Sequence, residues 1–335
     1  MLFENERISA RQMQAILILW IISTSLITLP YMAGSGIYSI VIGIGIVFFE
    51  SIIIAVTEKR ISGNNIIQKI AYILAAASVI FYSAMNIRFL CSAVNIYLLP
   101  NTPAWIIGAV ITLTVVYMAV MGIQTVGRTG EILFVIVFLN ALAALLLCVS
   151  DIDMSAVYRG KNIFGNGIRC AIMTASPQVL FILLPLTDSK NKYRQAVSAS
   201  VIAFAVVIVF VVLAVSKFGT VDTTMRAFPV LNITDTVNLE FVFGDKQHII
   251  MLRMWLFAAF SAVGSGIYAF RSVFKGKRLS SLIGGIVAFI FAVIPENAGE
   301  AVRYLWYAGE ISLVIFGIIL PLASLFIKGE EIRYE

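Results

Sequence analysis

Charged residues are scarce in this chain of 335 residues. Asp, Glu, Lys and Arg make up 13% of it and hydrophobic residues 60%, whereas charged residues are about 25% of an average soluble domain. With so few polar side chains, a fold of this length cannot cover its apolar surface with groups that water solvates, so lipid must solvate much of it. The composition therefore excludes a soluble globular domain and a disordered chain.

Residue types that carry catalysis or bind metals are also few. The chain has one histidine, His248, and three cysteines, Cys91, Cys148 and Cys170, none of which forms a CxxC pair. No HExxH or GxSxG motif occurs, and no two carboxylates share one of the membrane helices predicted below. We therefore expect no enzymatic activity, no cofactor and no metal site. His248 is interpreted as an interfacial polar residue and the cysteines as packing residues.

Basic residues outnumber acidic ones, 24 to 18, but they lie scattered between apolar runs. A nucleic-acid-binding protein would gather them in a patch, so we expect no nucleic acid partner. Their distribution fits the excess of Lys and Arg in cytoplasmic loops of membrane proteins. With the N-terminus inside, 15 basic residues fall on the cytoplasmic side and 8 outside, and Arg88 stays within the membrane. This bias predicts that both termini are cytoplasmic.

Long stretches without charge follow one another along the chain. About 20 apolar residues span a bilayer core, and a charge at its centre is costly. Together with the turn signals, these stretches predict an all-α integral membrane protein with one polytopic domain, 1–335, and an exposed outer insertion at about 217–248. The ten predicted transmembrane helices are 12–33, 37–57, 66–99, 104–121, 130–149, 164–187, 193–216, 249–274, 279–294 and 303–327.

Two of these helices, the first and the sixth, carry the same kind of interruption. In each, small hydroxyl residues precede an apolar stretch that ends in proline, and the two prolines, Pro30 and Pro185, are 155 residues apart. Matching interruptions in two halves are typical of inverted-repeat transporters, where broken helices surround a substrate at the middle of the membrane. The pattern predicts two inverted five-helix repeats, about 12–149 and 164–327. The helix-breaking residues are Pro30, Pro177 and Pro185.

Polar side chains at the interruptions are the candidate ligand-binding residues. The alternative is that they only pack the helices or kink them, as small polar residues often do in membranes. Two deeper charges, Glu50 and Arg88, lie at similar predicted heights in the second and third helices, and we predict that they form an intramembrane ion pair or share a polar network. The alternative is that each reaches the interface or meets backbone carbonyls separately. The candidate ligand-binding set is Ser23, Thr24, Ser25, Arg88, Thr174, Ser176 and Gln178.

The order of motifs resembles a known family. Ile8-Ser9 precedes the broken helix that ends at Leu29-Pro30, Arg88-Phe89 follows, and next comes the turn Leu99-Pro100-Asn101-Thr102-Pro103-Ala104-Trp105. The helix that contains Pro185, with the basic loop after it, fits the same pattern. Over nearly its whole length the chain is similar to spore germination proteins, specifically the B subunit of endospore germinant receptors. That family is similar in fold to amino-acid permeases of the APC superfamily, also described as LeuT-like.

The resemblance implies a germinant receptor B subunit. Such a subunit would bind a small nutrient, an amino acid by expectation, in a midplane cavity. It would trigger germination through A and C subunits in the inner spore membrane of an endospore-forming bacterium. A second hypothesis is a secondary amino-acid transporter of the APC type, because the same cavity serves alternating access. An intramembrane enzyme is the third and is disfavoured for lack of catalytic motifs.

Overall fold

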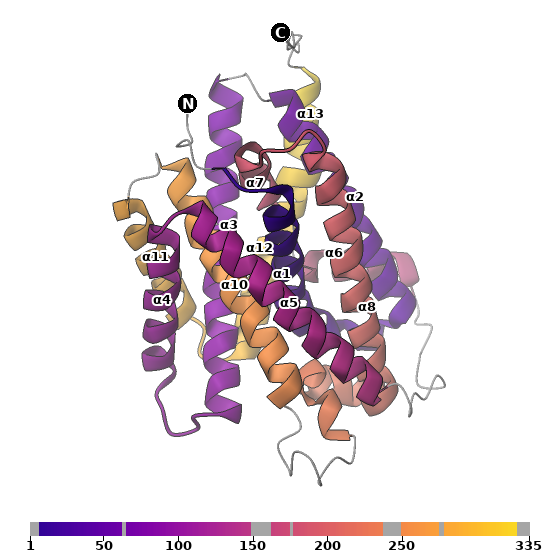
Figure 1. Ribbon diagram of the computed structural model, residues 1–335. Coiled ribbons are helices and arrows are strands. Elements are labelled where there is room, and N and C mark those ends of the chain that lie inside the picture. The colour runs from indigo at the N-terminus through magenta and orange to yellow at the C-terminus, as the bar shows by residue number, and fades with distance from the viewer. Residues whose placement is uncertain are drawn as a thin grey trace.

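The computed structural model describes residues 7–61, 65–148, 162–174, 177–236, 249–274 and 278–326. These residues form a helical bundle (Figure 1). The bounds of most elements lie within a few residues of the predicted helices. The elements are α1 (Ala10–Thr28), η1 (Leu29–Ser35), α2 (Ile37–Ile61), α3 (Asn65–Tyr97), α4 (Ala104–Val120), α5 (Ile123–Cys148), α6 (Ile163–Met173), α7 (Leu180–Leu186), α8 (Lys192–Met225), η4 (Pro229–Thr236), α10 (Ile249–Val273), α11 (Arg278–Val293), α12 (Ala298–Val314), η5 (Ile315–Ile319) and α13 (Leu320–Leu325).

Seven helical segments of the described chain are long and apolar enough to cross a membrane. They are α1 with η1, α2, α3, α5, α8, α10, and α12 with η5 and α13. The helices α4, α6 and α11 are apolar but shorter, so the count of ten membrane crossings stays a prediction. Among the predicted spans that form one unbroken helix, α3 is the longest, with 33 residues. At about 1.5 Å per residue it exceeds a ~30 Å hydrocarbon core, and in Figure 1 it runs the full height of the bundle.

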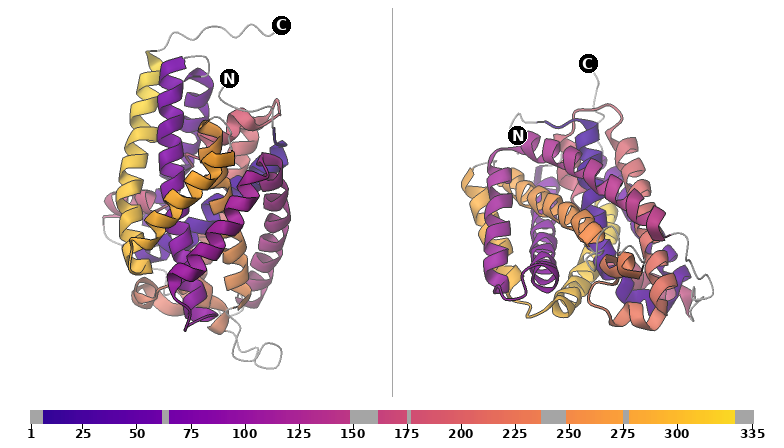
Figure 2. Two further views of the ribbon diagram at one scale, coloured as in Figure 1. Left: turned by 90° about the vertical axis from the view of Figure 1, so that its left-hand side faces the viewer. Right: turned by 60° about the horizontal axis from the view of Figure 1, so that its bottom comes forward.

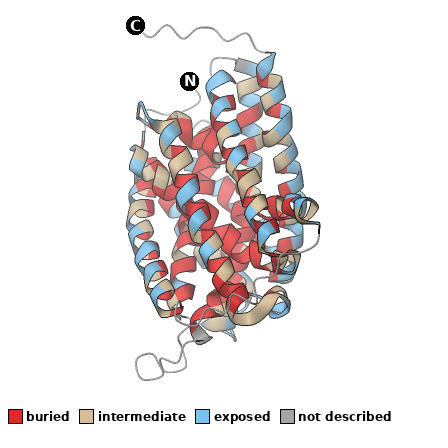
Figure 3. Cartoon of the chain, turned by 90° about the vertical axis from the view of Figure 1, so that its right-hand side faces the viewer, coloured by how far each residue is buried: buried red, intermediate tan, exposed pale blue. Residues whose placement is uncertain are grey.

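Apolar side chains cover both the interior and the outside of the bundle. Buried residues fill the centre, as Figure 3 shows, but large apolar residues such as Leu113 and Ile132 are more than 60% exposed on outer helix faces. In water this surface would be an aggregation hazard. In a bilayer it is the face that lipid solvates, which agrees with the composition.

Helix α1 lies at the centre and packs against α5, α8 and α10. Ser9 caps its first turn: the Ser9 hydroxyl accepts from the Gln12 N–H (3.2 Å), and the Gln12 side chain accepts from the Ser9 N–H (3.0 Å). This reciprocal pair satisfies two of the N–H groups left free at a helix start. From Ala15 to Thr28 every residue of α1 is buried, so polar side chains in this stretch face other helices.

The first helix is interrupted at the predicted Pro30 and not at the hydroxyl residues before it, because Ser23, Thr24 and Ser25 lie inside regular α-helix. Two of the hydroxyls in this helix bond to its own carbonyls, the Ser23 hydroxyl to Trp20 O (2.8 Å) and the Thr28 hydroxyl to Thr24 O (3.0 Å), and the ladder stays intact. The change comes later. At Pro30, which has no N–H for the ladder, the helix tightens into the 3₁₀ segment η1. Gly36, with φ of +85°, ends that segment.

The predicted interruption of the sixth helix is confirmed. Helix α6 ends at Met173, Thr174 is extended (φ −78°, ψ 145°), and α7 begins at Leu180. Pro177 lies in the connection, whereas Pro185 lies inside α7 one residue before its end. Residues 175 and 176, including the candidate Ser176, lie outside the described residues.

The predicted insertion is less exposed than expected. Helix α8 continues to Met225, and η4 follows it. Phe228, Val230, Leu231 and Ile233 are fully buried, because η4 packs against α8 and α10. The charged residues around this short apolar run favoured an exposed segment, whereas its apolar side chains are buried. His248 and the other residues from 237 to 248 lie outside the described residues.

The start of α1 and the helix α13 lie at the same end of the bundle, uppermost in Figures 1 and 2. At that end the Ile8 N–H donates to Leu186 O (3.0 Å), and the Asp188 N–H donates to Ile8 O (3.0 Å). These bonds tie the segment before α1 to the loop after α7. Both ends of the described chain thus lie at the same end of the bundle, and their cytoplasmic placement stays a prediction.

Candidate functional site

Four helices are linked by hydrogen bonds around the end of α6. The Thr28 hydroxyl of α1 lies 2.5 Å from Met173 O, the last carbonyl of α6. The Asn86 amide of α3 donates to the Thr24 hydroxyl (2.9 Å) and to Tyr82 O (3.0 Å). The indole N–H of Trp255 in α10 donates to Ser23 O (2.6 Å). We name Thr24, Thr28, Asn86 and Trp255, together with the buried Gln178 in the connection after α6, the buried polar network; Gln178 is bonded to Ser78 of α3 rather than to the other four.

Two amide oxygens of this network have no hydrogen-bond partner among the described residues. They are Asn86 Oδ1 and Gln178 Oε1, and both side chains are fully buried. The Gln178 amide nitrogen donates to the Ser78 hydroxyl of α3 (3.2 Å). A buried acceptor without a donor costs about 1–3 kcal/mol, so such groups call for a ligand or water that supplies N–H or O–H.

The structure brings some of the sequence candidates together and not others. Thr24 joins the hydrogen bonds between α1 and α3 through its hydroxyl, and Ser23 joins those between α1 and α10 only through its backbone carbonyl. Gln178 is bonded instead to Ser78 of α3. The Thr174 hydroxyl is directed back to Cys170 O (2.8 Å) within its own helix. Ser25 is buried in α1. Arg88 lies elsewhere, in the wall of the cavity described next.

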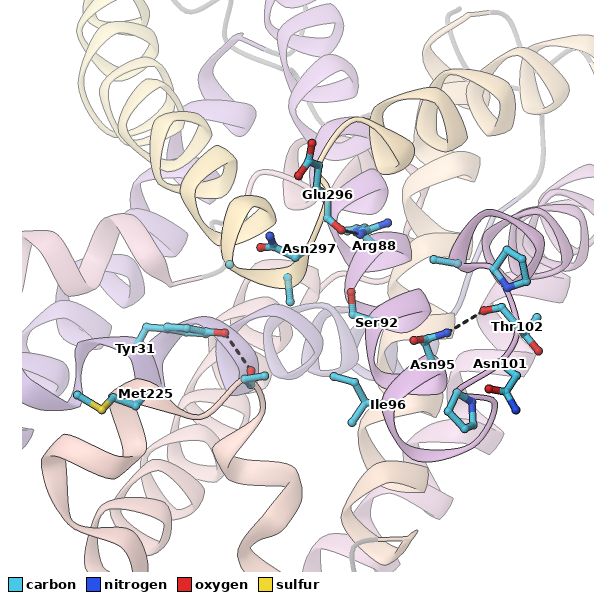
Figure 4. A pocket seen from close by; sticks show the side chains of 16 residues that line it. Tyr31, Arg88, Ser92, Asn95, Ile96, Asn101, Thr102, Met225, Glu296 and Asn297 are labelled. Atoms are coloured by element: carbon cyan, nitrogen blue, oxygen red, sulfur yellow. Dashed lines mark hydrogen bonds between the residues drawn. The ribbon is translucent and has the colours of Figure 1, made fainter.

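A second site opens at the end of the bundle opposite the chain ends. It is a cavity of about 760 Å³ between the end of α3, the turn before α4, η1 and the α11–α12 connection. Figure 4 shows Arg88, Ser92 and Asn95 of α3 along one wall and Asn297 at the start of α12. We call this cavity the vestibule. The Tyr31 hydroxyl donates to Ala227 O (2.9 Å) across it, and the Asn95 amide donates to Thr102 O (2.7 Å) in its wall.

Arg88 does not make the predicted ion pair with Glu50. Its guanidinium donates to the backbone carbonyl of Glu296 in the α11–α12 connection, and no Glu50–Arg88 pair occurs among the described residues. Glu50 is buried in α2. Similar height along two helices does not decide which faces meet. Here α3 directs Arg88 toward α11 and α12, both of which pack against it.

Asn86 and Trp255 were missed by the sequence reasoning. Asn86 is an isolated amide in an apolar run and is the kind of residue that membrane interiors rarely hold without a partner. The sequence carries this signal two residues before Arg88. Trp255 has no such signal, because tryptophan in an apolar helix is ordinary and only the packing of α10 on α1 shows where its N–H points. No cluster of three or more His, Cys, Asp or Glu lies in the described part of the chain.

The fold is that of LeuT-like transporters. The structure superposes on MhsT in complex with L-phenylalanine with a TM-score of 0.69 and 14% identity, covering 98% of this chain and 94% of MhsT. It superposes on MHP1, a nucleobase-cation-symport-1 family transporter, with a TM-score of 0.67 and 13% identity, covering 94% of this chain and 78% of MHP1. The class is thus a multi-pass membrane protein with a transporter fold.

Sequence comparison is more specific. Residues 7–301 match the family described as spore germination protein, and the chain belongs to that family. It is 23% identical to spore germination protein YndE of Bacillus subtilis (strain 168), over 99% of both chains. It is 24% identical to spore germination protein KB of the same organism, over 96% of this chain and 93% of that protein. The chain is accordingly a germination receptor or permease-like membrane protein.

Proposed function

We propose that this chain is the nutrient-binding B subunit of a germinant receptor, and that an amino acid binds at the buried polar network. The observation that carries the proposal is the pair of buried, partnerless amide oxygens, Asn86 Oδ1 and Gln178 Oε1. An ammonium group has three N–H donors and no acceptor, so it satisfies such oxygens directly. Ser23, Ser25 and Thr174 border this site in the proposal, and Ser176, which lies outside the described residues, stays a candidate from the sequence alone.

The end of α6 adds to the attraction for a cation. The last carbonyls of a helix carry its negative partial charge, and Met173 O is held toward α1 by the Thr28 hydroxyl. In the proposal, an ammonium beside α6 is attracted by Met173 O and accepted by the amide oxygens of Asn86 and Gln178. MhsT, which shares the fold, is described in complex with L-phenylalanine, and this supports an amino acid as the ligand class.

The competing interpretation is that the network only holds helices together. Interhelical hydrogen bonds of Ser, Thr, Asn and Gln do so in membranes. Thr24→Val and Gln178→Leu separate the two readings, with Thr114→Val, an exposed hydroxyl on α4, as the matched control. Losing one hydrogen bond to a charged ligand costs about 1.5–3 kcal/mol, so Kd should rise about tenfold or more. The assay is binding of a panel of L-amino acids to the purified protein in nanodiscs.

Equal affinity in all three variants, with thermal midpoints lowered only in Thr24→Val and Gln178→Leu, would assign the network to packing alone. Flux separates a receptor from the APC-type transporter that is our second candidate. Binding of an amino acid without its uptake into proteoliposomes supports a receptor, whereas concentrative uptake supports the transporter.

Assembly with A and C subunits in the inner spore membrane, with both termini cytoplasmic, belongs to the same proposal. Co-expression of the tagged chain with the A and C subunits of its host should yield a complex that survives purification. Recovery of the chain alone, from preparations in which both other subunits are present in the membrane, would count against a three-subunit receptor.

A further inference from the structure

Two cavities meet at Arg88. One is the vestibule, and the other is a smaller cavity of about 360 Å³ between α3, α4 and α11. Arg88, Ala104 and Glu296 line both, so the guanidinium stands at their junction. Each volume falls in the range of roughly 300–1,000 Å³ that small-molecule sites occupy. We call the smaller one the side cavity.

The guanidinium of Arg88 is only partly used. One terminal nitrogen donates to Glu296 O, while the buried Nε–H has no hydrogen-bond partner among the described residues. The side chain is half-buried, and arginine stays charged at any physiological pH. A carboxylate matches the planar fork of donors on a guanidinium and pairs with it through charge-assisted hydrogen bonds.

The two cavities differ in chemistry. The vestibule wall carries hydroxyl and amide groups from Tyr31, Ser92, Asn95 and Asn297 (Figure 4). Apart from Arg88 and Glu296, the side cavity is lined by apolar or weakly polar residues, among them Ile87, Cys91, Phe289 and Val293. A polar space and an apolar space on either side of one cation suit a ligand with a charged end and an apolar tail.

Two carboxylates lie near this junction and do not neutralise Arg88. The Glu300 carboxylate accepts from the Glu296 N–H (2.8 Å) at the start of α12. The Glu296 side chain is exposed, and Figure 4 shows its carboxylate turned away from the Arg88 guanidinium. No ion pair involves Arg88 among the described residues. The cation therefore remains available to an incoming anion.

We propose that the junction of the vestibule and the side cavity is a second, outer binding site for a small carboxylate with an apolar tail, such as a branched-chain amino acid. The carboxylate pairs with Arg88 and the tail enters the side cavity between α3, α4 and α11. The site is separate from the buried polar network and shares no residue with it.

Binding of L-leucine to the purified protein in nanodiscs of neutral lipid tests the site, with L-leucinamide and L-alanine as comparison probes. Leucinamide lacks the carboxylate, and alanine lacks the tail. Arg88→Gln should raise Kd for leucine at this site about tenfold or more, while Arg303→Gln, an exposed arginine of α12 that lines neither cavity, should leave it unchanged. Leucinamide should bind wild type as weakly as leucine binds Arg88→Gln.

The tail is tested by filling the side cavity. Val293→Trp should weaken leucine more than alanine, and Ile294→Trp, at the neighbouring exposed position outside the cavity, should not. Equal effects of the two tryptophans, or an Arg88→Gln variant that binds leucine as wild type does, would overturn the proposal. The proposal would also be overturned if leucine did not bind wild type in neutral lipid and anionic lipid bound wild type but not Arg88→Gln, since the site would then hold a lipid headgroup.

Stoichiometry separates this site from the buried one. Two leucines per chain in wild type, one after Arg88→Gln and one after Gln178→Leu, is the result expected if both sites exist. If wild type binds a single leucine, and this leucine is lost in Arg88→Gln but kept in Gln178→Leu, the buried site alone is refuted. A single leucine with the opposite dependence would refute the outer site alone.

Discussion

The last turn of α6, just before the interruption, is held between two glycines, and this packing makes a sharp prediction. A Cβ on Gly43 of α2 would lie 2.7 Å from Ala171 N and 2.8 Å from the Cys170 carbonyl carbon. A Cβ on Gly309 of α12 would collide with the backbone carbonyl oxygen of Ile172. Because these are backbone atoms, they cannot rotate away as a side chain would. Either alanine must push α6 or separate the helices.

Gly45 is the matched control for Gly43. It lies two residues further along α2, and a Cβ there would meet no heavy atom within 4 Å. Replacing a helical glycine by alanine gains about 0.5–1 kcal/mol in backbone entropy, whereas overpacking costs about 1–3 kcal/mol. Gly45→Ala shows the gain alone and Gly43→Ala shows gain and cost together. Their difference therefore isolates the packing term. An added Cβ on Gly317 would also meet no heavy atom within 4 Å, so Gly317→Ala is the control for Gly309→Ala.

Thermal unfolding of the purified variants measures the difference. In chains of 150–250 residues each kcal/mol moves the midpoint by roughly 2–4 °C, so Gly43→Ala should melt several degrees below Gly45→Ala. Because Gly43 and Gly309 press on the same turn, the double variant should not be the sum of the single ones. Equal midpoints for Gly43→Ala and Gly45→Ala would refute the reasoning that α6 is held by close backbone approach.

Two further predictions concern the buried cation of α10 and the sidedness of the chain. Arg271→Gln should cost about 1.5–3 kcal/mol of stability, because this buried guanidinium donates to Ala119 O (2.8 Å) and Val120 O (3.0 Å) at the end of α4. The control is Arg278→Gln at an exposed position. Equal thermal midpoints for the two variants would refute the claim that Arg271 stabilises the packing of α10 on α4. A membrane-impermeant maleimide should label Asn101→Cys from outside and Arg278→Cys only from inside, while the native cysteines, which are buried, stay unlabelled; the reverse sidedness would refute the topology.

The helices were largely predictable, whereas the contacts between them were not. Charge-free runs placed α2, α4 and α11 closely, because avoidance of charge in lipid acts on each segment separately. The interruption of the sixth helix was predictable for a similar reason, since Pro177 removes a backbone donor wherever it lies. The change at Pro30 was predictable in the same way, but the sequence did not show that Ser23 leaves the helix intact, because a hydroxyl either disrupts a helix or bonds back to its own carbonyl, and the neighbours decide which.

The sequence by itself determined that this protein is a membrane protein built of apolar helices, because composition carries that information. It also determined that the protein belongs to the spore germination family, because the order of motifs along the chain is sufficient for that assignment. Only the tertiary structure decided that Arg88 meets Glu296 rather than Glu50, that Asn86 reaches Thr24, and that Gly43 and Gly309 hold the end of α6. Each of these contacts depends on how helices are rotated about their axes, and rotation is set by packing against several neighbours at once.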